Sequence, residues 1–387
     1  MAILFWLCAS SIIWVYAGYP FFLGLLSRIR TPRRVQTGNL EPAVTLIISA
    51  YNEAEVIRAK IANSLTLDYP RHKLDIVVVS DCSSDGTDKI VAEYETQGVR
   101  LLRMHERGGK TLGLNAAIPR AYGDIIVFSD ANAIYDHQVV RHMVRNFADP
   151  KVGCVTGESR YNLDGATDST QSENLYWRYE LALKKMETNL GSLVGGDGAI
   201  YAIRKKLYRP MQPADLSDFV NPMQITLQGY RNVYEPAAVC YENGADTSSQ
   251  EFRRKVRIVS RAWRGLWRVG GVLNPLRFGL FTVQVLSHKL LRWLVPVFMI
   301  GAFAANIFLW REALFYAAAG AVQILFYALA LTGLAQSRRA SAPKIFYVPY
   351  YFCLINYASL LGILSYYRGQ NFTTWQTVRE PMVISRA

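Results

Sequence analysis

Oxygen-bearing side chains follow two short apolar stretches in the first third of the chain. Asp130 and Asn132 come after residues 124–128 (DIIVF), and Asp81 follows residues 74–80 (LDIVVVS). Side chains two residues apart at the end of a strand project from the same face. A carboxylate beside an amide oxygen suits Mg²⁺ or Mn²⁺ bound to a diphosphate. A solvated turn is the simpler interpretation of one such pair, but the second acidic strand end favours a ligand site.

The sequence around these side chains predicts the elements that hold them. Short β-branched and apolar runs are expected as strands, and they alternate with helical stretches. The expected strands cover residues 44–49, 74–80, 99–102 and 124–128, and the expected helices cover residues 54–65, 89–96 and 111–121. This alternation predicts an α/β fold with a mostly parallel sheet covered on both faces. Ligands of such sheets bind beyond the carboxyl ends of the strands, where Asp81 and Asp130 lie.

Two common nucleotide-binding motifs do not fit this chain. Gly109-Lys110-Thr111 supplies the end of a P-loop, but Met104 stands where its first glycine is required. Gly196 and Gly198 begin a GxGxxG pattern whose last position is Tyr201. Both motifs therefore fail by position, and the predicted site is neither a P-loop nor a dinucleotide-binding turn.

Cysteine and histidine spacing excludes two further classes of site. The five cysteines contain no CxxC pair, and the closest histidines, His137 and His142, do not form HExxH. The sequence therefore predicts neither a zinc site nor a disulfide framework. Reduced thiols are typical of a cytoplasmic domain.

The first residues are expected to cross a membrane. Residues 2–27 carry no charge, and Arg28 and Arg30 follow at once. About 20 apolar residues suffice for a transmembrane helix, and flanking arginines place that end in the cytoplasm. A cleaved signal peptide is the alternative, but no positive residue precedes the long apolar run. We therefore predict an uncleaved anchor over residues 1–27.

The last hundred residues are predicted to form a second membrane region, at residues 291–366. Its expected spans are residues 291–310, 313–334 and 345–366, preceded by an interfacial amphipathic helix at 272–290 and followed by a tail at 367–387. Four spans that begin outside would leave the tail outside, whereas Arg368, Arg379 and Arg386 favour the cytoplasm. The formal net charge of +13 is explained by contact with membrane lipids rather than with nucleic acid.

Several motifs occur in an order that resembles a known family. The segments VTLIISAYNEAEVI, LDIVVVSDCSSDGT, GGKTLGLNAA and GDIIVFSDANA are similar to those of family 2 glycosyltransferases with the GT-A fold. The flanking apolar segments resemble the branch that contains cellulose, chitin and hyaluronan synthases. The resemblance covers residues 43–265 and implies a catalytic domain at residues 40–270.

The resemblance implies roles for the strand-end residues. Lys110 would lie near the base or the diphosphate, and Asp130 would be the first acid of the DxD metal motif, with Asn132 in place of the second acid. The residues implied to hold the nucleoside are Tyr51, Asn52, Glu53 and Asp81. The implied cofactor is Mn²⁺ or Mg²⁺.

The second half of the domain would contact the sugar and the acceptor. Asp197, in Gly195-Gly196-Asp197-Gly198, is a candidate sugar contact, although a tight turn explains the segment nearly as well. Asp218 matches the family's general base, a carboxylate that takes the proton of the acceptor hydroxyl. Asp215 is the alternative base, and a helix N-cap is an alternative role for either aspartate.

Residues 251–268 form a strongly basic stretch that departs from the family pattern. Arg254 and Arg257 share a helical face and are expected to contact the donor. The family motif QxxRW keeps its arginine as Arg257, but Arg254 and Ile258 replace the glutamine and the tryptophan. Trp263 is the candidate substitute for that tryptophan.

Together these features predict a membrane-embedded enzyme. Its expected reaction is inverting, metal-dependent transfer from a nucleotide diphosphate-sugar, with a UDP-sugar favoured, to a glycan or lipid-linked acceptor near the membrane. The expected setting is cell-surface polysaccharide synthesis at a bacterial inner membrane, with a cytoplasmic catalytic domain. The alternatives are a nucleotidyltransferase acting on sugar phosphates, an inactive nucleotide-sugar-binding homologue, and a transporter or channel with a nucleotide-sensing domain.

Overall fold

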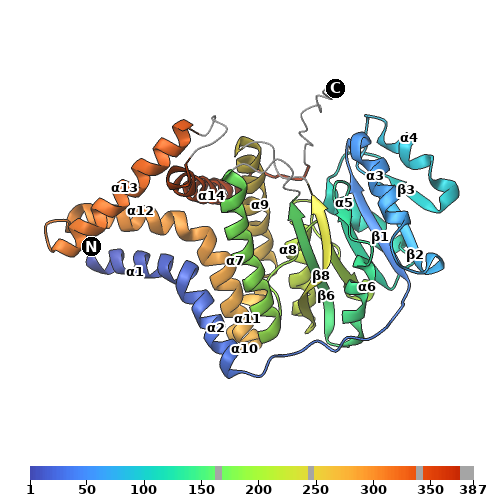
Figure 1. Ribbon diagram of the computed structural model, residues 1–387, viewed down its shortest axis with the longest axis horizontal. Coiled ribbons are helices and arrows are strands. Elements are labelled where there is room, and N and C mark those ends of the chain that lie inside the picture. The colour runs from blue at the N-terminus through green and yellow to red at the C-terminus, as the bar shows by residue number, and fades with distance from the viewer. Residues whose placement is uncertain (162–167, 243–247, 337–342, 375–387) are drawn as a thin grey trace.

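The computed structural model describes residues 1–161, 168–242, 248–336 and 343–374. An α/β domain forms one end of the molecule, long apolar helices form the other, and α7 and α9 stand between them (Figure 1). The strands are β1 (Val44–Ala50), β2 (Leu74–Ser80), β3 (Val99–Arg103), β4 (Ile125–Asp130), β5 (Ile134–Tyr135), β6 (Val152–Tyr161), β7 (Ile200–Arg204) and β8 (Arg231–Glu242).

The helices fall into the same two regions. Those of the α/β domain are α3 (Ala54–Leu65), α4 (Thr87–Ala92), α5 (Lys110–Ala117), α6 (Val139–Val144), α7 (Asp168–Leu190), α8 (Ser217–Leu227) and α9 (Ser248–Arg268). Those of the apolar region are α1 (Ala2–Ile13), α2 (Tyr19–Ile29), α10 (Pro275–Phe278), α11 (Leu280–Val285), α12 (Leu291–Leu309), α13 (Leu314–Gln336) and α14 (Lys344–Tyr367).

The strands of the described residues form one mixed sheet in the order β3-β2-β1-β4-β7-β6-β8-β5. Strands β1 to β4 run parallel, while β7 is antiparallel to both β4 and β6. Every residue of β1 is buried, because helices cover both faces of the sheet. Leu46 and Ile48 pack with α3 and α6 on one face, and Ile47 packs with α5, α8 and α9 on the other.

The predicted α/β architecture is confirmed, and the four expected strands begin and end within two residues of β1 to β4. The predicted helix at 89–96 is shorter: α4 ends at Ala92 and a separate 3-10 turn, Glu95–Gln97, follows. The predicted helix at 111–121 likewise ends in a 3-10 turn, Ile118–Arg120, whose second residue is Pro119. A proline cannot donate the next helical hydrogen bond, which explains the change.

In the part of the chain that the structure describes, four helices are long and apolar enough to cross a membrane, by length and composition. They are Ala2–Ile29, Leu280–Leu309, Leu314–Gln336 and Lys344–Tyr367. Their positions agree with the four predicted spans. Of the predicted tail at 367–387, residues 375–387 lie outside the described part of the chain.

The predicted amphipathic helix at 272–290 is wrong as a separate element. After the short helix α10, residues Leu280–Leu309 run as one helix that contains the π-helical turn Leu286–Leu290. The charged residues that suggested an interfacial helix are Arg277, His288 and Lys289; Arg277 is exposed, but the other two lie against protein. His288 is buried, and its ring nitrogens lie 2.7 Å from Glu187 and 3.1 Å from Glu180 of α7.

The basic helix α9 joins the two regions. A Cβ on Gly362 of α14 would stand 2.8 Å from the carbonyl oxygen of Val256 in α9. Only a glycine lets the two helix backbones approach so closely. Arg264 of α9 lies over the ring of Tyr366, 5.0 Å from its centroid. The last apolar helix is thus packed directly against the helix of the α/β domain that carries Arg254 and Arg257.

Candidate active site

The turns after β1 and β2 interlock at the carboxyl edge of the sheet. Asn52 and Cys82 adopt left-handed backbone conformations, with φ of 52° and 59°. The Asn52 N–H donates to Ser83 Oγ (3.1 Å), and the Ser84 N–H donates to Asn52 Oδ1 (2.9 Å). Asn52 was expected to hold a nucleoside. In this structure its amide fixes the neighbouring turn, so its direct contact with a nucleoside stays a prediction.

Tyr51 and Glu53 flank this turn. The guanidinium of Arg107 stacks on the ring of Tyr51, 3.7 Å from its centroid. Glu53 is buried, and its N–H donates to Thr87 Oγ1 at 2.9 Å. Arg107 was not singled out from the sequence, although its place next to Gly108-Gly109 was a usable signal. A flat base can stack on such an aromatic and guanidinium pair.

Asp81 organises the loop before Lys110. Its side chain is 2% exposed and accepts the N–H groups of Gly108 (2.8 Å) and Gly109 (2.9 Å). Gly109 has φ of 88°, a conformation that favours glycine. The two predicted donor-binding residues Asp81 and Lys110 are therefore brought together by this glycine loop.

Lys110 connects the first half of the domain to the second. Its ammonium donates to Oδ1 of Asp130 at the end of β4 and to the carbonyl oxygen of Gly198 (2.9 Å). The glycine-rich segment therefore lies at the carboxyl edge of the parallel strands. Asn132, two residues beyond Asp130, is partly buried and forms no hydrogen bond with another described residue.

The side chains at the end of β4 fit a divalent ion that is held largely by a ligand. No group of three or more His, Cys, Asp or Glu residues able to hold a metal occurs in the described part of the chain. Asp130 nevertheless binds a cation, the Lys110 ammonium, through Oδ1. Mg²⁺ in nucleotide sites is commonly held by one or two carboxylates together with substrate phosphates. Asp130 with the amide oxygen of Asn132 is consistent with that pattern.

Asp197 is used mainly to hold the fold. It accepts a hydrogen bond from Ser159 Oγ (2.9 Å), and one of its carboxylate oxygens lies 3.6 Å from Lys184 Nζ. The Ala199 N–H also donates to it, at 3.3 Å. These contacts favour the tight-turn interpretation of the segment, and the sugar contact of Asp197 stays a prediction.

The two candidate bases have different surroundings. Asp215 is fully buried, pairs with Arg268, and accepts the Gln212 N–H at 2.7 Å. Asp218 is partly buried, and one of its carboxylate oxygens lies 3.3 Å from the position that a Cβ on Gly198 would take. Neither caps α8, whose N-cap is Leu216 without a side-chain bond. The structure therefore ties Asp215 to packing and turns Asp218 toward the glycine-rich segment.

The surroundings of Asp218 favour its predicted role as the general base. Burial raises the pKa of its carboxyl, and the negative charge of Asp197 raises the pKa further, while Lys110 and Arg261 oppose the shift. A carboxylate with a raised pKa is a stronger proton acceptor. Its carbonyl oxygen accepts the Gly196 N–H at 2.7 Å, which fixes α8 against the glycine-rich segment.

Arg257 and Arg254 differ in how they face the site. Burial and the charge of Arg254 lower the pKa of Arg257, and Asp130 and Asp218 are the acids that oppose this shift. Arg257 thus lies near both acids, and its side chain forms no ion pair or hydrogen bond within the described residues. The Arg254 side chain is 45% exposed and lies 3.7 Å from Glu251. Arg257 is the better placed of the two for a diphosphate.

Trp263 does not replace the missing tryptophan of the family motif. Its side chain is buried and packs against Trp267 and Trp293, with ring centroids 5.6 Å and 6.3 Å away. Trp293 also packs edge-on against Phe219, the residue after Asp218, at 5.8 Å. The tryptophan is therefore part of the core that supports α8.

Glu242, at the end of β8, was missed in the sequence. Burial, with the charges of Asp130 and Asp197, raises the pKa of its carboxyl to about 8. Lys110 and Arg254 oppose the shift. Its only sequence signal was the position at a strand end, which became visible once β8 was placed beside β6 and β5.

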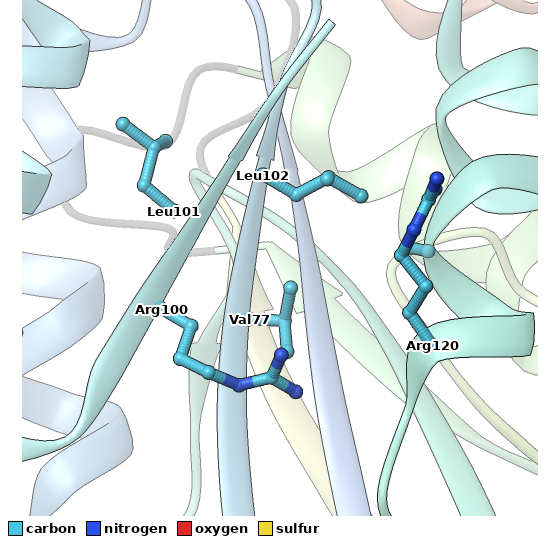
Figure 2. Close-up of a pocket in the computed structure, with 6 residues that line it drawn as sticks. Val77, Arg100, Leu101, Leu102 and Arg120 are labelled. Atoms are coloured by element: carbon cyan, nitrogen blue, oxygen red, sulfur yellow. The ribbon is translucent and has the colours of Figure 1, made fainter.

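A small cavity elsewhere in the domain belongs to packing. It has a volume of about 60 Å³ and lies between β2, β3 and the helix that follows β3. Figure 2 shows Arg100 and Arg120 beside Val77, Leu101 and Leu102. Arg100 is already paired with Asp75, at 2.9 Å and 2.6 Å. None of the predicted site residues lines this cavity.

Comparison with known proteins agrees with the arrangement of the domain. Residues 45–209 match the family model described as glycosyl transferase family 2. The matched segment contains the ends of β1, β2 and β4 and the glycine-rich segment, and it stops before Asp218.

Two similar curated proteins are synthases of poly-beta-1,6-N-acetyl-D-glucosamine. The one from Staphylococcus aureus (strain COL) is 27% identical over 263 residues, which are 66% of this chain and 63% of that protein. The one from Staphylococcus epidermidis is 23% identical over 267 residues, with the same coverage. The chain therefore spans less than two thirds of the length of these relatives.

A solved structure shares the fold along nearly the whole chain. It is a mannosyltransferase from Pyrobaculum calidifontis in complex with GDP-Man and Mn²⁺. The TM-score is 0.72 at 22% identity, covering 95% of this chain and 100% of the other. The GT-A fold is thus shared together with the flanking helices, and the sequence matches agree with it, since residues 45–209 are similar to glycosyl transferase family 2.

Proposed function

We propose that the protein is a membrane-bound inverting glycosyltransferase that uses a UDP-sugar and a divalent metal ion. The observation that carries the proposal is the linkage through Lys110, whose ammonium bonds both Asp130 and the Gly198 carbonyl. This linkage brings the predicted diphosphate site next to Asp218. The name of the staphylococcal relatives favours an N-acetylglucosamine donor and cell-surface polysaccharide as the product.

Each proposed residue has a distinct task in the transfer. Tyr51 with Arg107 would stack on the base, and Asp81 would hold the glycine loop that carries Lys110. Lys110 and Arg257 would balance the charge of the diphosphate. A divalent ion held by Asp130 and Asn132 would add Lewis-acid stabilisation of the leaving group. Asp218 would take the proton of the acceptor hydroxyl.

The proposed setting is a membrane. The four long apolar helices support an integral membrane protein, and Arg28, Arg30, Arg33 and Arg34 favour a cytoplasmic catalytic domain. The expected acceptor is a glycan or a lipid-linked sugar close to the membrane.

A donor screen with the purified full-length protein tests the proposal. UDP-N-acetylglucosamine, UDP-glucose and GDP-mannose would be supplied with Mn²⁺, with Mg²⁺ or with EDTA, and the released nucleotide would be measured. We expect UDP release from UDP-N-acetylglucosamine with metal and little release in EDTA. Product NMR should show an inverted anomeric centre. Release of pyrophosphate instead would indicate a nucleotidyltransferase and would overturn the proposal.

A further inference from the structure

Lys289, on the second long apolar helix, reaches the glycine-rich segment of the site. It lies in the π-helical turn Leu286–Leu290, and its side chain is partly buried. A Cβ on Gly195 would stand 3.8 Å from Cε of Lys289 and 4.0 Å from the carbonyl oxygen of Asp218. The lysine therefore approaches the segment that holds the proposed base, and it does so from the apolar helices.

The carboxylates around Lys289 are bonded to other groups. Glu187 lies 2.7 Å from Nδ1 of His288, and Glu180 lies 3.1 Å from Nε2 of the same ring. Glu180 also pairs with Arg292. Within the described residues the Lys289 ammonium itself forms no hydrogen bond or ion pair. Glu180 and Glu187 therefore act on Lys289 through their charge alone, and neither bonds directly to its ammonium.

An unpaired ammonium away from bulk water is costly unless an anion accompanies it. π-helical turns inside α-helices are often found at functional sites. Here the turn carries Lys289 and is itself anchored by a hydrogen bond from Trp14 Nε1 to Ser287 Oγ (3.0 Å). These observations indicate that Lys289 is held in place for an anionic group of a ligand.

The position of Lys289 indicates which of the two substrates, the donor or the acceptor, would carry this anionic group. Lys110 contacts the Gly198 end of the glycine-rich segment, where the donor diphosphate is expected, whereas Lys289 approaches the Gly195 end. An anion at Lys289 would therefore belong to the acceptor. Because the lysine is part of the helix Leu280–Leu309, that acceptor would come from the membrane. A membrane-borne sugar with an anionic group is a sugar linked to a lipid through phosphate.

We propose that Lys289 binds the phosphate of a lipid-linked acceptor sugar and thereby places the acceptor hydroxyl at Asp218. This proposal rests on the proposed function and specifies its acceptor. In the transfer, the hydroxyl oxygen forms a bond to C1 of the donor sugar, and the bond between C1 and the diphosphate oxygen breaks. The electron pair leaves with the nucleoside diphosphate, and the proton passes to Asp218.

Direct binding measurements test the proposal without requiring turnover. The full-length protein in phosphatidylcholine nanodiscs would be titrated with a short-chain polyprenyl diphosphate N-acetylglucosamine and, separately, with octyl N-acetylglucosaminide, which lacks phosphate. We expect wild type to bind the diphosphate lipid at least about 10-fold more tightly. Lys289→Met should weaken that binding about 10- to 100-fold, the usual value of a charge-assisted contact, and leave octyl glycoside binding unchanged. Lys289→Arg should retain most of the affinity.

The controls separate this proposal from its alternatives. Lys185→Met, on the exposed face of α7, should bind both acceptors as wild type does. Equal weakening of both acceptors by Lys289→Met, or no preference for phosphate in wild type, would overturn the proposal. The nanodisc lipid would also be changed to phosphatidylglycerol. If the effect of Lys289→Met depended on this lipid and not on the acceptor, Lys289 would bind lipid headgroups, and the proposal would be overturned. Failure of the proposed function would instead appear as absent nucleotide release from every donor.

Discussion

Two regions of the proposed site hold their acids differently. The donor-side loops are those that follow β1, β2 and β4. The acceptor-side segment consists of residues 195–198 and the start of α8. On the donor side, Asp81 accepts two backbone N–H groups and Asp130 pairs with Lys110. On the acceptor side, Asp218 is partly buried and burial raises its pKa. The acids of the donor side are thus held by direct bonds, whereas the acceptor side carries the proposed base, a carboxyl whose pKa is raised by burial.

The two sides are also anchored to different parts of the molecule. The donor-side turns are tied to one another, as by the 2.9 Å bond from the Ser84 N–H to Asn52. The acceptor-side segment is tied to the apolar helices through Glu187, which accepts the Val194 N–H at 3.1 Å and the Tyr19 hydroxyl at 2.6 Å. Donor recognition should therefore survive changes on the acceptor side, and the variants below test this separation.

The largest effect is expected from Asp130→Ala. The change removes the carboxylate that pairs with Lys110 and that we expect to hold the metal. Transfer should fall by about 10⁴-fold or more, because both the charge balance and the Lewis acid at the leaving group are lost. Nucleotide release with a Mn²⁺ titration measures this. Asn132→Ala is the matched control and should lose less activity; full wild-type activity in EDTA would show that the metal assignment is mistaken.

Asp218→Asn should remove the base and spare donor binding. The amide is nearly isosteric but cannot accept a proton, and loss of a general base typically costs about 10²–10⁴-fold in rate. The dissociation constant of the donor should stay close to that of wild type, since the change lies on the acceptor side. Single-turnover transfer and donor titration measure the two quantities separately.

Asp215→Asn is the matched control for that experiment. Asp215 pairs with Arg268, and its carbonyl oxygen accepts the Thr111 hydroxyl at 2.9 Å. Its substitution should lower the melting temperature and leave the chemical step largely intact, because the pair fastens α9 to the domain. A strong rate loss in Asp215→Asn with a mild one in Asp218→Asn would transfer the role of base to Asp215.

Much of the donor side could be predicted from sequence because its signals are local. Asp81 and Asp130 each end an apolar strand, and parallel strands bring such ends together. The role of Asn52 in the turn could not be predicted in the same way, since it depends on Ser83 and Ser84 in the loop after β2.

The acceptor side was harder to predict because its partners are remote in the chain. Asp197 bonds to Ser159, 38 residues away, and no local sequence pattern indicates that this contact holds the segment in the fold. Lys289 and His288 suggested an interfacial helix, because charge within an apolar stretch is typical of a membrane surface. Only the fold shows that α7 supplies acids there.

Gly109→Ala should affect the donor and spare the acceptor. Gly109 has φ of 88°, and a Cβ there would stand 2.0 Å from the carbonyl oxygen of Thr373, so the loop has to move. The two N–H bonds to Asp81 would then be disturbed, and the donor KM should rise by about 10-fold. Gly86→Ala is the control, because Gly86 also has a positive φ but a Cβ there would meet no atom of the described residues within 4 Å. It should cost about 1–2 kcal/mol of stability and leave the donor KM unchanged.

The smallest effect is a shift in the pH dependence of transfer. The base acts only when deprotonated, so kcat/KM should rise with pH through the pKa of Asp218. Burial raises that pKa, and Asp197 raises it further, so the acid limb should lie above the ordinary aspartate value of about 4. Asp197→Asn removes one of the raising charges and should move the limb to lower pH, whatever it does to the absolute rate. Asp218→Asn should abolish the limb. The acid limb of the pH profile could instead stay in place in Asp197→Asn or persist in Asp218→Asn. Either result would mean that another group on the acceptor side takes the proton.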